Sequence, residues 1–248
     1  MQLNNNKILV AMSGGVDSSV AAALLVEQGF EVAGITITPF KITDECRDKT
    51  HAKSCCSYAS AMEAAEISRK LGIEHFLVDH TDLFRESVVD NFIGEYLSGR
   101  TPNPCVICNR LIKWDQLLKK ADAIGAKYLA TGHYAKLRRT DAGMAVLQKG
   151  SDPIKDQSYF LWNLTKEHLS RTVFPIGDIN KTETRAIAER LGLAVAKKPD
   201  SQEVCFIPDN DYRRFLVEAR PEIEAELANG EIVFGGKVIG RHQGFPFY

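Results

Sequence analysis

A short apolar run, a Ser/Gly-rich turn and an alanine-rich segment open the chain, and this combination limits its possible folds most strongly. The run covers residues 8–12, the turn holds Ser13, Gly14 and Gly15, and the segment that follows has helical spacing. This order predicts a buried strand, a phosphate-binding loop and a helix. The two glycines let the backbone approach a bulky anion, and the unpaired amides of the first helical turn point toward it.

The polar side chains of this loop predict a nucleotide site that uses magnesium. Ser13 and Ser18 supply hydroxyl donors, and Asp17 places a carboxylate where a phosphate-bound Mg²⁺ would bind. The loop matches neither the Walker A pattern nor the dinucleotide fingerprint, because it lacks both G-x-x-x-x-G-K-[ST] and G-x-G-x-x-G. Its pattern S-G-G-x-D-S-S resembles instead the pyrophosphate loop of the N-type ATP pyrophosphatases, which split ATP between the α and β phosphates.

The composition predicts a cytoplasmic protein and gives no indication of a membrane partner. The 248 residues, 44% of them hydrophobic, are enough for one large α/β domain and a smaller appendage. A net charge of −1 gives no overall attraction to nucleic acid, so an RNA site must be a local basic patch. The chain has no apolar run of about 18 residues and no signal-peptide core. Its six cysteines are therefore expected to be reduced.

Alternating strand and helix patterns predict an α/β, Rossmann-like fold with a parallel sheet flanked by helices. The expected strands cover residues 8–12, 31–38, 73–78 and 126–135. The expected helices cover residues 58–71, 81–97, 181–191, with Thr182 as N-cap, 211–219 and 221–228. Two hairpins are expected as well, one with an edge strand at 144–148 and one over 231–239. We expect a catalytic domain over residues 1–207 and a small α+β segment over residues 208–248.

A C-x-x-C pair follows two prolines and is the first candidate for chemistry. Pro102 and Pro104 exclude a helix through their own stretch, which leaves Cys105 and Cys108 on the first turn of the next helix. The helix dipole there stabilises a thiolate. A redox dithiol, a metal or iron–sulfur site with Cys205 as a third ligand, and a nucleophilic or sulfur-carrying role all remain open, and the last is favoured. Cys46, Cys55 and Cys56, in or beside a polar loop, lack zinc-ligand spacing.

Other polar groups are predicted at the carboxyl edge of the sheet or close to RNA. Gly132, at a strand end, would allow close approach of a nucleotide, and His133 could contact phosphate or a base. The head of the segment 155–161 could meet RNA, while its apolar end is expected to be buried. Cys205 lies between a basic, flexible approach and an apolar anchor, an arrangement that suits a thiol that must move.

Five motifs in one order carry a resemblance to a known family. They are the phosphate loop, T-P-N-P-x-x-x-C-N, T-G-H-Y, K-D-Q-S-Y-F-L and D-S-x-x-x-C-F-I. Together they closely resemble the tRNA-specific 2-thiouridylases of the MnmA type over residues 7–248. The resemblance implies ATP binding by Ala11, Met12, Ser13, Gly14, Gly15, Val16, Asp17, Ser18, Ile37 and Gly132. It implies tRNA contacts by Asn103, Pro104, Cys105, His133, Lys155, Asp156 and Gln157.

The same resemblance implies a tRNA-uridine 2-sulfurtransferase that acts on the wobble uridine. ATP and Mg²⁺ would convert the uracil C2 oxygen into an adenylate, with release of pyrophosphate and then AMP. Cys205 would carry the persulfide, supplied by a cysteine desulfurase or a sulfur-relay protein. Cys108 would free the sulfur by a transient disulfide with Cys205 or by release of hydrogen sulfide. The anticodon base would have to leave its stack.

Three departures from the family pattern keep alternatives open. Cys105 stands where many relatives carry Asp, which leaves a [4Fe-4S] cluster on Cys105, Cys108 and Cys205 under consideration. Ile37 replaces a methionine near the adenine. Relatives continue beyond the equivalent of residues 242–244 into a β-barrel that is expected to be absent here. The alternatives are a truncated, inactive ATP- and tRNA-binding remnant and an amide-forming ATP pyrophosphatase that uses ammonia on a small molecule.

Overall fold

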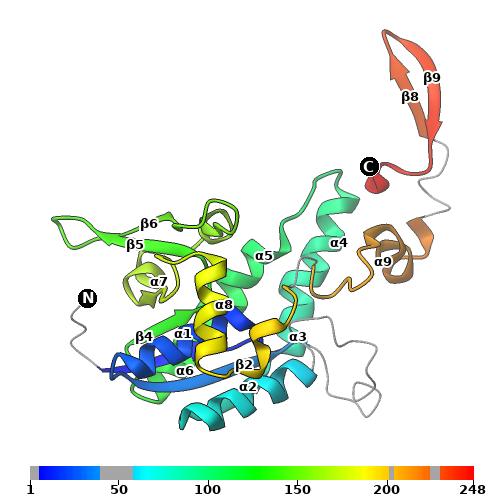
Figure 1. Cartoon of the computed structure of the whole chain (residues 1–248). Helices are drawn as coiled ribbons and strands as arrows, with labels where there is room; N and C mark the ends of the chain where they lie inside the picture. The colour runs from blue at the N-terminus through cyan, green and yellow to red at the C-terminus, as the bar shows by residue number, and fades with distance from the viewer. Residues whose placement is uncertain (1–5, 40–57, 201–203, 224–229) are drawn as a thin grey trace.

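A five-stranded parallel sheet forms the core of the main body, at the lower left of Figure 1. The computed structural model describes residues 6–39, 58–200, 204–223 and 230–248. The strands lie in the order β3-β2-β1-β4-β7, and every neighbouring pair is parallel. Their bounds are Lys7–Ala11 (β1), Glu31–Thr38 (β2), Glu74–Asp79 (β3), Tyr128–Thr131 (β4) and Thr172–Val173 (β7). The predicted Rossmann-like fold is thus confirmed.

Helices cover both faces of the sheet, which explains why its central strands are mostly apolar and do not alternate. On one face, Ile8 and Val10 of β1 share a core with α1 (Val16–Glu27), α2 (Tyr58–Leu71) and α8 (Lys181–Arg190). On the other face, Leu9 packs against α6, which spans Asp115–Ala123. The predicted helix over residues 58–71 is confirmed.

A long helical arm leaves the sheet after β3 and carries the C-terminal part of the chain. It consists of α3 (Thr81–Phe84), a π-helical turn η3 (Arg85–Val89) and α4 (Asp90–Leu97), so the helix predicted over residues 81–97 is interrupted once. Against it packs α9 (Tyr212–Ala219). The Tyr96 and Tyr212 rings stack with centroids 4.8 Å apart. The segment after residue 207 therefore shares an aromatic cluster with α4.

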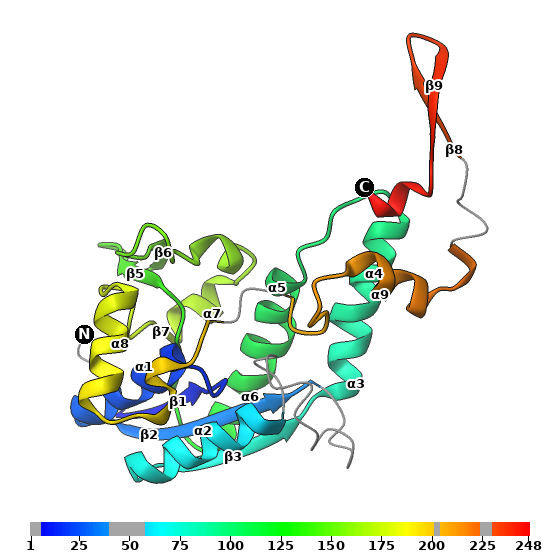
Figure 2. The ribbon, with the colours of Figure 1, turned by 45° about the vertical axis from the view of Figure 1, so that its right-hand side comes forward.

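Two antiparallel hairpins stand apart from the central sheet. The strand predicted over residues 126–135 is divided, because β4 ends at Thr131 and β5 (Ala135–Arg139) pairs with β6 (Ala145–Lys149) in a second sheet. The predicted C-terminal hairpin is present as β8 (Gly230–Phe234) and β9 (Lys237–His242), which extends away from the body (Figure 2). The last turn, η7 (Phe245–Phe247), returns to α4.

Short helical segments complete the fold. They are α5 (Pro104–Ile107), the π-helical η4 (Cys108–Trp114), the 3-10 turn η5 (Ser158–Leu161), α7 (Lys166–Ser170) and the 3-10 turn η6 (Ala194–Lys197). No helix within the described residues is long and apolar enough to cross a membrane.

Two local predictions are wrong, and others fall outside the described residues. Asn180, not Thr182, caps α8, because its side chain accepts the Glu183 N–H at 2.9 Å and Glu183 returns a bond to the Asn180 N–H in a capping box. Tyr159 is exposed, although a buried segment was expected to begin there. The loop with Cys46, Cys55 and Cys56 and the residues 224–228 of the helix predicted over 221–228 lie outside the described residues.

Candidate active site

The phosphate loop is closed by its own hydroxyl groups. The Ser13 N–H donates to Ser18 Oγ over 3.1 Å, and Ser19 Oγ donates to the Gly15 carbonyl over 2.7 Å. Ser13 is exposed and Asp17 is half-buried, while Ser18 and Ser19 are buried. The first-turn amides of α1 lack acceptors within the helix, so the loop presents donors at the carboxyl end of β1.

Close backbone contacts leave no room for a side chain at two positions, Gly14 in the loop and Gly132 beside it. Gly14 has a φ of +68°, and a Cβ there would lie 2.2 Å from the Ser60 carbonyl oxygen of α2. A Cβ on Gly132 would lie 2.5 Å from the Ser18 nitrogen. The sequence predicted that Gly132 admits a nucleotide; in the structure this glycine admits the N-terminus of α1 against the end of β4.

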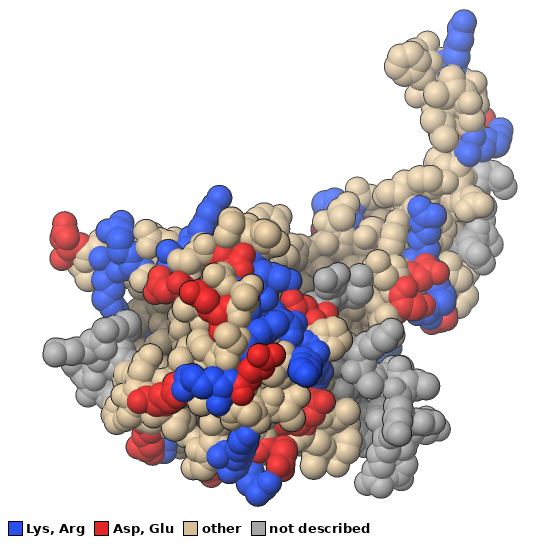
Figure 3. Space-filling model, in the orientation of Figure 1, with Lys and Arg blue, Asp and Glu red and all other residues tan. Residues whose placement is uncertain are grey.

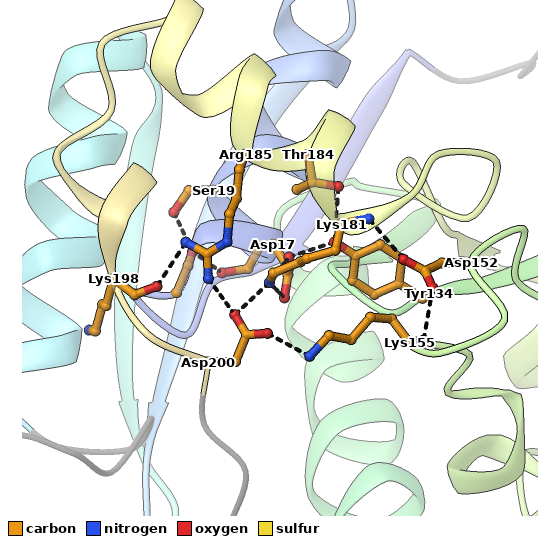
Figure 4. A network of polar contacts seen from close by, with 12 residues as sticks. Asp17, Ser19, Tyr134, Asp152, Lys155, Lys181, Thr184, Arg185, Lys198 and Asp200 are labelled. Carbon is orange, nitrogen blue, oxygen red and sulfur yellow. Dashed lines mark hydrogen bonds and ion pairs between the residues drawn. The ribbon is translucent and has the colours of Figure 1, made fainter.

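Ion pairs connect the loop to segments far along the chain (Figure 4). Lys181 Nζ, from the first turn of α8, lies 2.7 Å from Asp17 Oδ1 and 2.8 Å from Asp200 Oδ1. Lys155 and Arg185 also pair with Asp200, at 2.7 and 2.8 Å. The Tyr134 hydroxyl donates to Asp17 Oδ1 over 2.9 Å, and burial raises the pKa of Tyr134. Lys181 thus joins two carboxylates, one on the phosphate loop and one ahead of Cys205.

Contacts hold the segment ahead of Cys205 in place as far as Asp200, beyond which residues 201–203 are not described. Lys198 Nζ donates to the Gly14 carbonyl over 3.0 Å and pairs with Glu63. The Arg185 guanidinium donates to the Ala196 carbonyl over 2.7 Å. The sequence predicted a flexible approach here; Lys198 and Asp200 make the contacts given above, and residues 201–203 lie outside the described part.

The charge of Asp200 is predicted to stabilise the fold down to low pH. Burial acts to raise the pKa of Asp200, but the hydrogen bonds and charges of Lys155 and Lys181 outweigh it and lower this pKa to about 2. A carboxyl group with a lowered pKa contributes stability above its ordinary value of about 3.9, and this contribution is lost as the pH falls toward the folded-state value.

We expect Asp200→Asn to lower the free energy of unfolding by on the order of 2 kcal/mol near pH 6. The difference from the wild type should shrink between about pH 4 and pH 2. Urea unfolding across this range measures it. Asp178→Asn is the control, because Asp178 is 85% exposed and pairs with Lys136 only at 3.7 Å. If the difference in free energy of unfolding between Asp200→Asn and the wild type stays constant with pH, the lowered pKa of Asp200 is contradicted.

The two candidate thiols border one hydrophobic cluster. Cys108 and Cys205, both partly buried, pack against the cluster that contains Phe84, Phe92 and Phe206. Ile37, near the carboxyl end of β2, packs against the same cluster. The two thiols are therefore found on one side of the molecule, next to a strand end that neighbours the end of β1.

The C-x-x-C pair is divided between two helical turns. Asn103 caps α5, Pro104 is its first residue and the exposed Cys105 lies in its first turn, as the prolines predict. Cys108 starts the π-helical η4, one turn further in. The prediction that both thiols lie on the first turn is therefore wrong for Cys108, and the dipole acts mainly on Cys105.

The polar groups predicted to touch RNA are engaged inside the protein. Lys155 pairs with Asp200, Asp156 Oδ1 accepts the Gly150 N–H over 2.8 Å, and Gln157 Oε1 accepts the Tyr134 N–H over 3.0 Å. The last two contacts hold the segment before η5 against the start of β5 and the end of β6.

The His133 imidazole lies among aromatic rings at the end of β4. Its centroid is 5.8 Å from that of Trp114 and 6.3 Å from that of Phe174, and its Nδ1 is 2.8 Å from Thr131 Oγ1. Burial, and then the charge of Lys113, hold the pKa of His133 well below its ordinary value. The ring is therefore neutral at neutral pH.

Lys181, Arg185, Asp200 and Tyr134 were not predicted as site residues. Each lies in a segment whose local pattern indicates only a helix, a strand end or a loop, and 164 positions separate Lys181 from Asp17. A lysine directly after a helix N-cap, where the dipole disfavours positive charge, was the one local signal for Lys181.

Comparison with known proteins identifies the family. A family model described as the tRNA methyl transferase HUP domain matches residues 6–209. The tRNA-specific 2-thiouridylase MnmA of Carboxydothermus hydrogenoformans is 47% identical over 99% of this chain and 67% of its own length. The chain belongs to the tRNA-specific 2-thiouridylase family. The 2-thiouridylase of Heliobacterium modesticaldum is 50% identical over 97% of this chain and 62% of its own length.

Solved structures agree with this 2-thiouridylase fold. A 4-thiouridine synthetase, solved in complex with RNA and bound ATP, aligns with 87% of this chain and 50% of its own chain at a TM-score of 0.54 and 19% identity. A glutamine-dependent NAD+ synthetase from Acinetobacter baumannii aligns with 91% of this chain and 36% of its own at a TM-score of 0.50 and 13% identity. At these identities the likeness establishes the fold alone.

The 2-thiouridylase relatives are longer than this chain, which spans 62% of one and 67% of the other.

The sequence left open a metal or iron–sulfur site held by the cysteines. Within the described part, which includes Cys105, Cys108 and Cys205, no three His, Cys, Asp or Glu side chains gather in a way that could hold a metal ion.

Proposed function

We propose that this chain catalyses ATP-dependent 2-thiolation of the wobble uridine of tRNA. One observation carries the proposal: Cys108 and Cys205 border the same cluster as Ile37, beside the strand ends that hold the phosphate loop. Two thiols near a phosphate-binding edge fit a reaction in which ATP activates a carbonyl oxygen and sulfur replaces it. The 2-thiouridylase relatives support the substrate, and the ATP and RNA of the 4-thiouridine synthetase complex agree with it.

ATP binding is assigned to the loop and the neighbouring strand ends. The residues proposed are Ala11 to Ser18, with Ile37 and Gly132 at adjacent strand ends. Asp17 would hold Mg²⁺, because this ion usually takes one or two carboxylates together with phosphate oxygens and waters, and the Asp17 side chain is 31% exposed. Bound Mg²⁺ would neutralise phosphate charge. Lys181, already at Asp17, supplies a second positive charge beside the loop.

The chemistry begins with activation of a poor electrophile. The uracil C2 oxygen attacks the α-phosphorus of ATP, the bond to the β-phosphate breaks, and pyrophosphate leaves toward the loop amides and Lys181. The oxygen on C2 is then part of an adenylate and can leave as AMP. The base must be out of its stack to place C2 near the thiols, which RNA loops allow more easily than duplexes.

Sulfur then moves through both cysteines. A donor persulfide first transfers its outer sulfur to the Cys205 thiolate. The terminal sulfur of the Cys205 persulfide attacks C2, and AMP leaves with the C2 oxygen. The Cys108 thiolate attacks Cys205 Sγ, so the S–S bond breaks, its electron pair goes to the sulfur on C2, and a Cys108–Cys205 disulfide forms. Two external thiols, or one dithiol, supply the two electrons that reopen this disulfide and are themselves oxidised to a disulfide.

The partners follow from these steps. The donor is proposed to be a cysteine desulfurase or a sulfur-relay protein, because either presents a persulfide. Asn103, Pro104 and Cys105 lie directly ahead of Cys108 and are proposed near the target uridine. Over the described residues of the face shown in Figure 3, acidic and basic side chains are mixed around α8, which agrees with a local RNA site and not with a broad basic field.

Incubation of the chain with tRNA, ATP, Mg²⁺ and a persulfide-charged cysteine desulfurase is the direct test. We expect 2-thiouridine in the nucleosides by mass spectrometry, together with AMP and pyrophosphate in equal amounts. Omission of ATP is the control and should remove the product. Normal ATP binding with no 2-thiouridine would contradict the proposal and support an ATP- and tRNA-binding remnant.

A further inference from the structure

Two exposed aromatic rings lie on the segment that packs against the cysteine-bearing helix. Tyr159 is 67% exposed and Trp162 is 64% exposed, and Ile154, just ahead of them, is 88% exposed. Large apolar side chains exposed together on one short segment indicate a surface with a partner. We infer that Tyr159 and Trp162 form a platform on which unpaired bases of the RNA stack beside Cys108. The inference rests on the proposed function and adds residues to its RNA site.

The backbone of η5 places both rings on one side. Tyr159 and Trp162 are three residues apart, and Trp162 continues the 3-10 turn with φ −61° and ψ −25°. In a 3-10 helix the side chains at i and i+3 eclipse, about 6 Å apart along the axis. Both side chains therefore leave the turn on the same side, where the Tyr159 ring also meets Phe160 edge-on with centroids 5.7 Å apart, and the two exposed rings offer faces on which neighbouring bases can stack.

Hydrogen bonds tie this turn to the residues that directly follow Cys108. Asn109 Nδ2 donates to the Phe160 carbonyl over 2.9 Å, and Arg110 Nη1 donates to Asn163 Oδ1 over 3.0 Å. η5 also contacts α5 and η4. The platform is thus fixed relative to the thiol proposed as the nucleophile, and a base held there would lie beside the uridine that reacts.

A neighbouring charge favours RNA as the occupant. Arg110 bonds a neutral amide, and no ion pair within the described residues involves it. Aromatic rings beside a guanidinium group recognise single-stranded nucleic acid, since bases stack on the rings and a phosphate can meet the cation.

The polar head of the same segment does not provide this contact surface. Lys155, Asp156 and Gln157 are held by other groups of the protein. The exposed part of the segment is therefore the aromatic part. A sulfur-donor protein could use exposed aromatic residues too, and the experiment separates this occupant from RNA.

Tryptophan fluorescence reports on the platform directly. The chain has two tryptophans, and Trp114 is fully buried whereas Trp162 is exposed. Titration of the full chain with an anticodon stem-loop RNA should quench Trp162. The variant Trp162→Phe should lose this quenching yet bind the RNA within a few-fold, because a phenyl ring still stacks. Tyr159→Ala and Trp162→Ala should each weaken RNA binding about 10-fold.

Controls make each outcome decisive. Met62→Ala removes a side chain that is 51% exposed on α2, and it should leave RNA affinity unchanged. Thermal melting and ATP binding check that the variants fold. Absence of quenching while tRNA is still thiolated overturns the platform and leaves the proposed function intact. Quenching with ring-dependent affinity but no thiolation supports the platform and defeats the proposed function. Loss of sulfur uptake from the donor with unchanged RNA affinity overturns the inference in favour of a protein-docking surface.

Discussion

Serine in place of either Cys108 or Cys205 is expected to reduce formation of 2-thiouridine on the order of 10³-fold or more. A serine hydroxyl cannot carry a persulfide, so Cys205→Ser removes the sulfur that attacks C2. Cys108→Ser removes the thiolate that opens the Cys205 linkage and leaves the base attached to the protein through sulfur. Both side chains border one hydrophobic cluster. A thiol at another position of this cluster could not take the place of either one without a change of geometry.

Cys105→Ser is the matched control, because the exposed Cys105 lies on the first turn of α5, three residues ahead of Cys108. Sulfur transfer by two thiols predicts that this variant keeps measurable activity. A cluster held by all three cysteines predicts loss with each substitution, together with loss of iron in a metal assay. Mass spectrometry of the tRNA and ATP-binding titrations measure the three variants side by side. If Cys108→Ser and Cys205→Ser both convert ATP to AMP and pyrophosphate at the wild-type rate, the result would support an amide-forming enzyme instead.

Local pattern was sufficient for most of the sheet, because β1, β2 and β4 contain buried apolar runs, but it missed the two-residue strand β7 and joined β4 to β5. Glu31–Thr38 and Tyr58–Leu71 were predicted with the bounds that the structure shows. Prolines located the start of α5 equally well, since they restrict their own φ and the residue before them. These features depend only on residues that are neighbours in the sequence, so one sequence is enough to predict them.

The ion-pair network could not be predicted in the same way. Asp17, Lys155, Lys181 and Asp200 belong to four separate segments, and only the packing of α8 on α1 brings their charges together. The exposure of Tyr159 was missed for a related reason. The run Tyr-Phe-Leu is apolar in composition, but the 3-10 turn buries Leu161 and directs Tyr159 outward, and no periodicity distinguishes a turn this short.

Alanine at Gly14 is expected to damage the phosphate loop far more than alanine at a glycine of the same conformation elsewhere. Gly14 and Gly72 have φ values of +68° and +69°. A Cβ on Gly72 meets nothing within 4 Å, whereas one on Gly14 would lie 2.2 Å from the Ser60 carbonyl oxygen. Gly72→Ala therefore reports the left-handed backbone alone, which costs roughly 1–2 kcal/mol.

The difference between the two variants isolates the contact between the loop and α2. Gly14→Ala should lose about 1–3 kcal/mol beyond the loss in Gly72→Ala, because backbone atoms of α2 must move to admit the methyl group. The displaced loop should also bind ATP at least about 10-fold more weakly, since its donors must lie within hydrogen-bond distance of the phosphates. Urea unfolding and calorimetric ATP titration measure the two effects. Equal losses in both variants, with ATP affinity unchanged in Gly14→Ala, would show that the loop does not depend on its approach to Ser60, and the phosphate site would then have to be sought at another strand end.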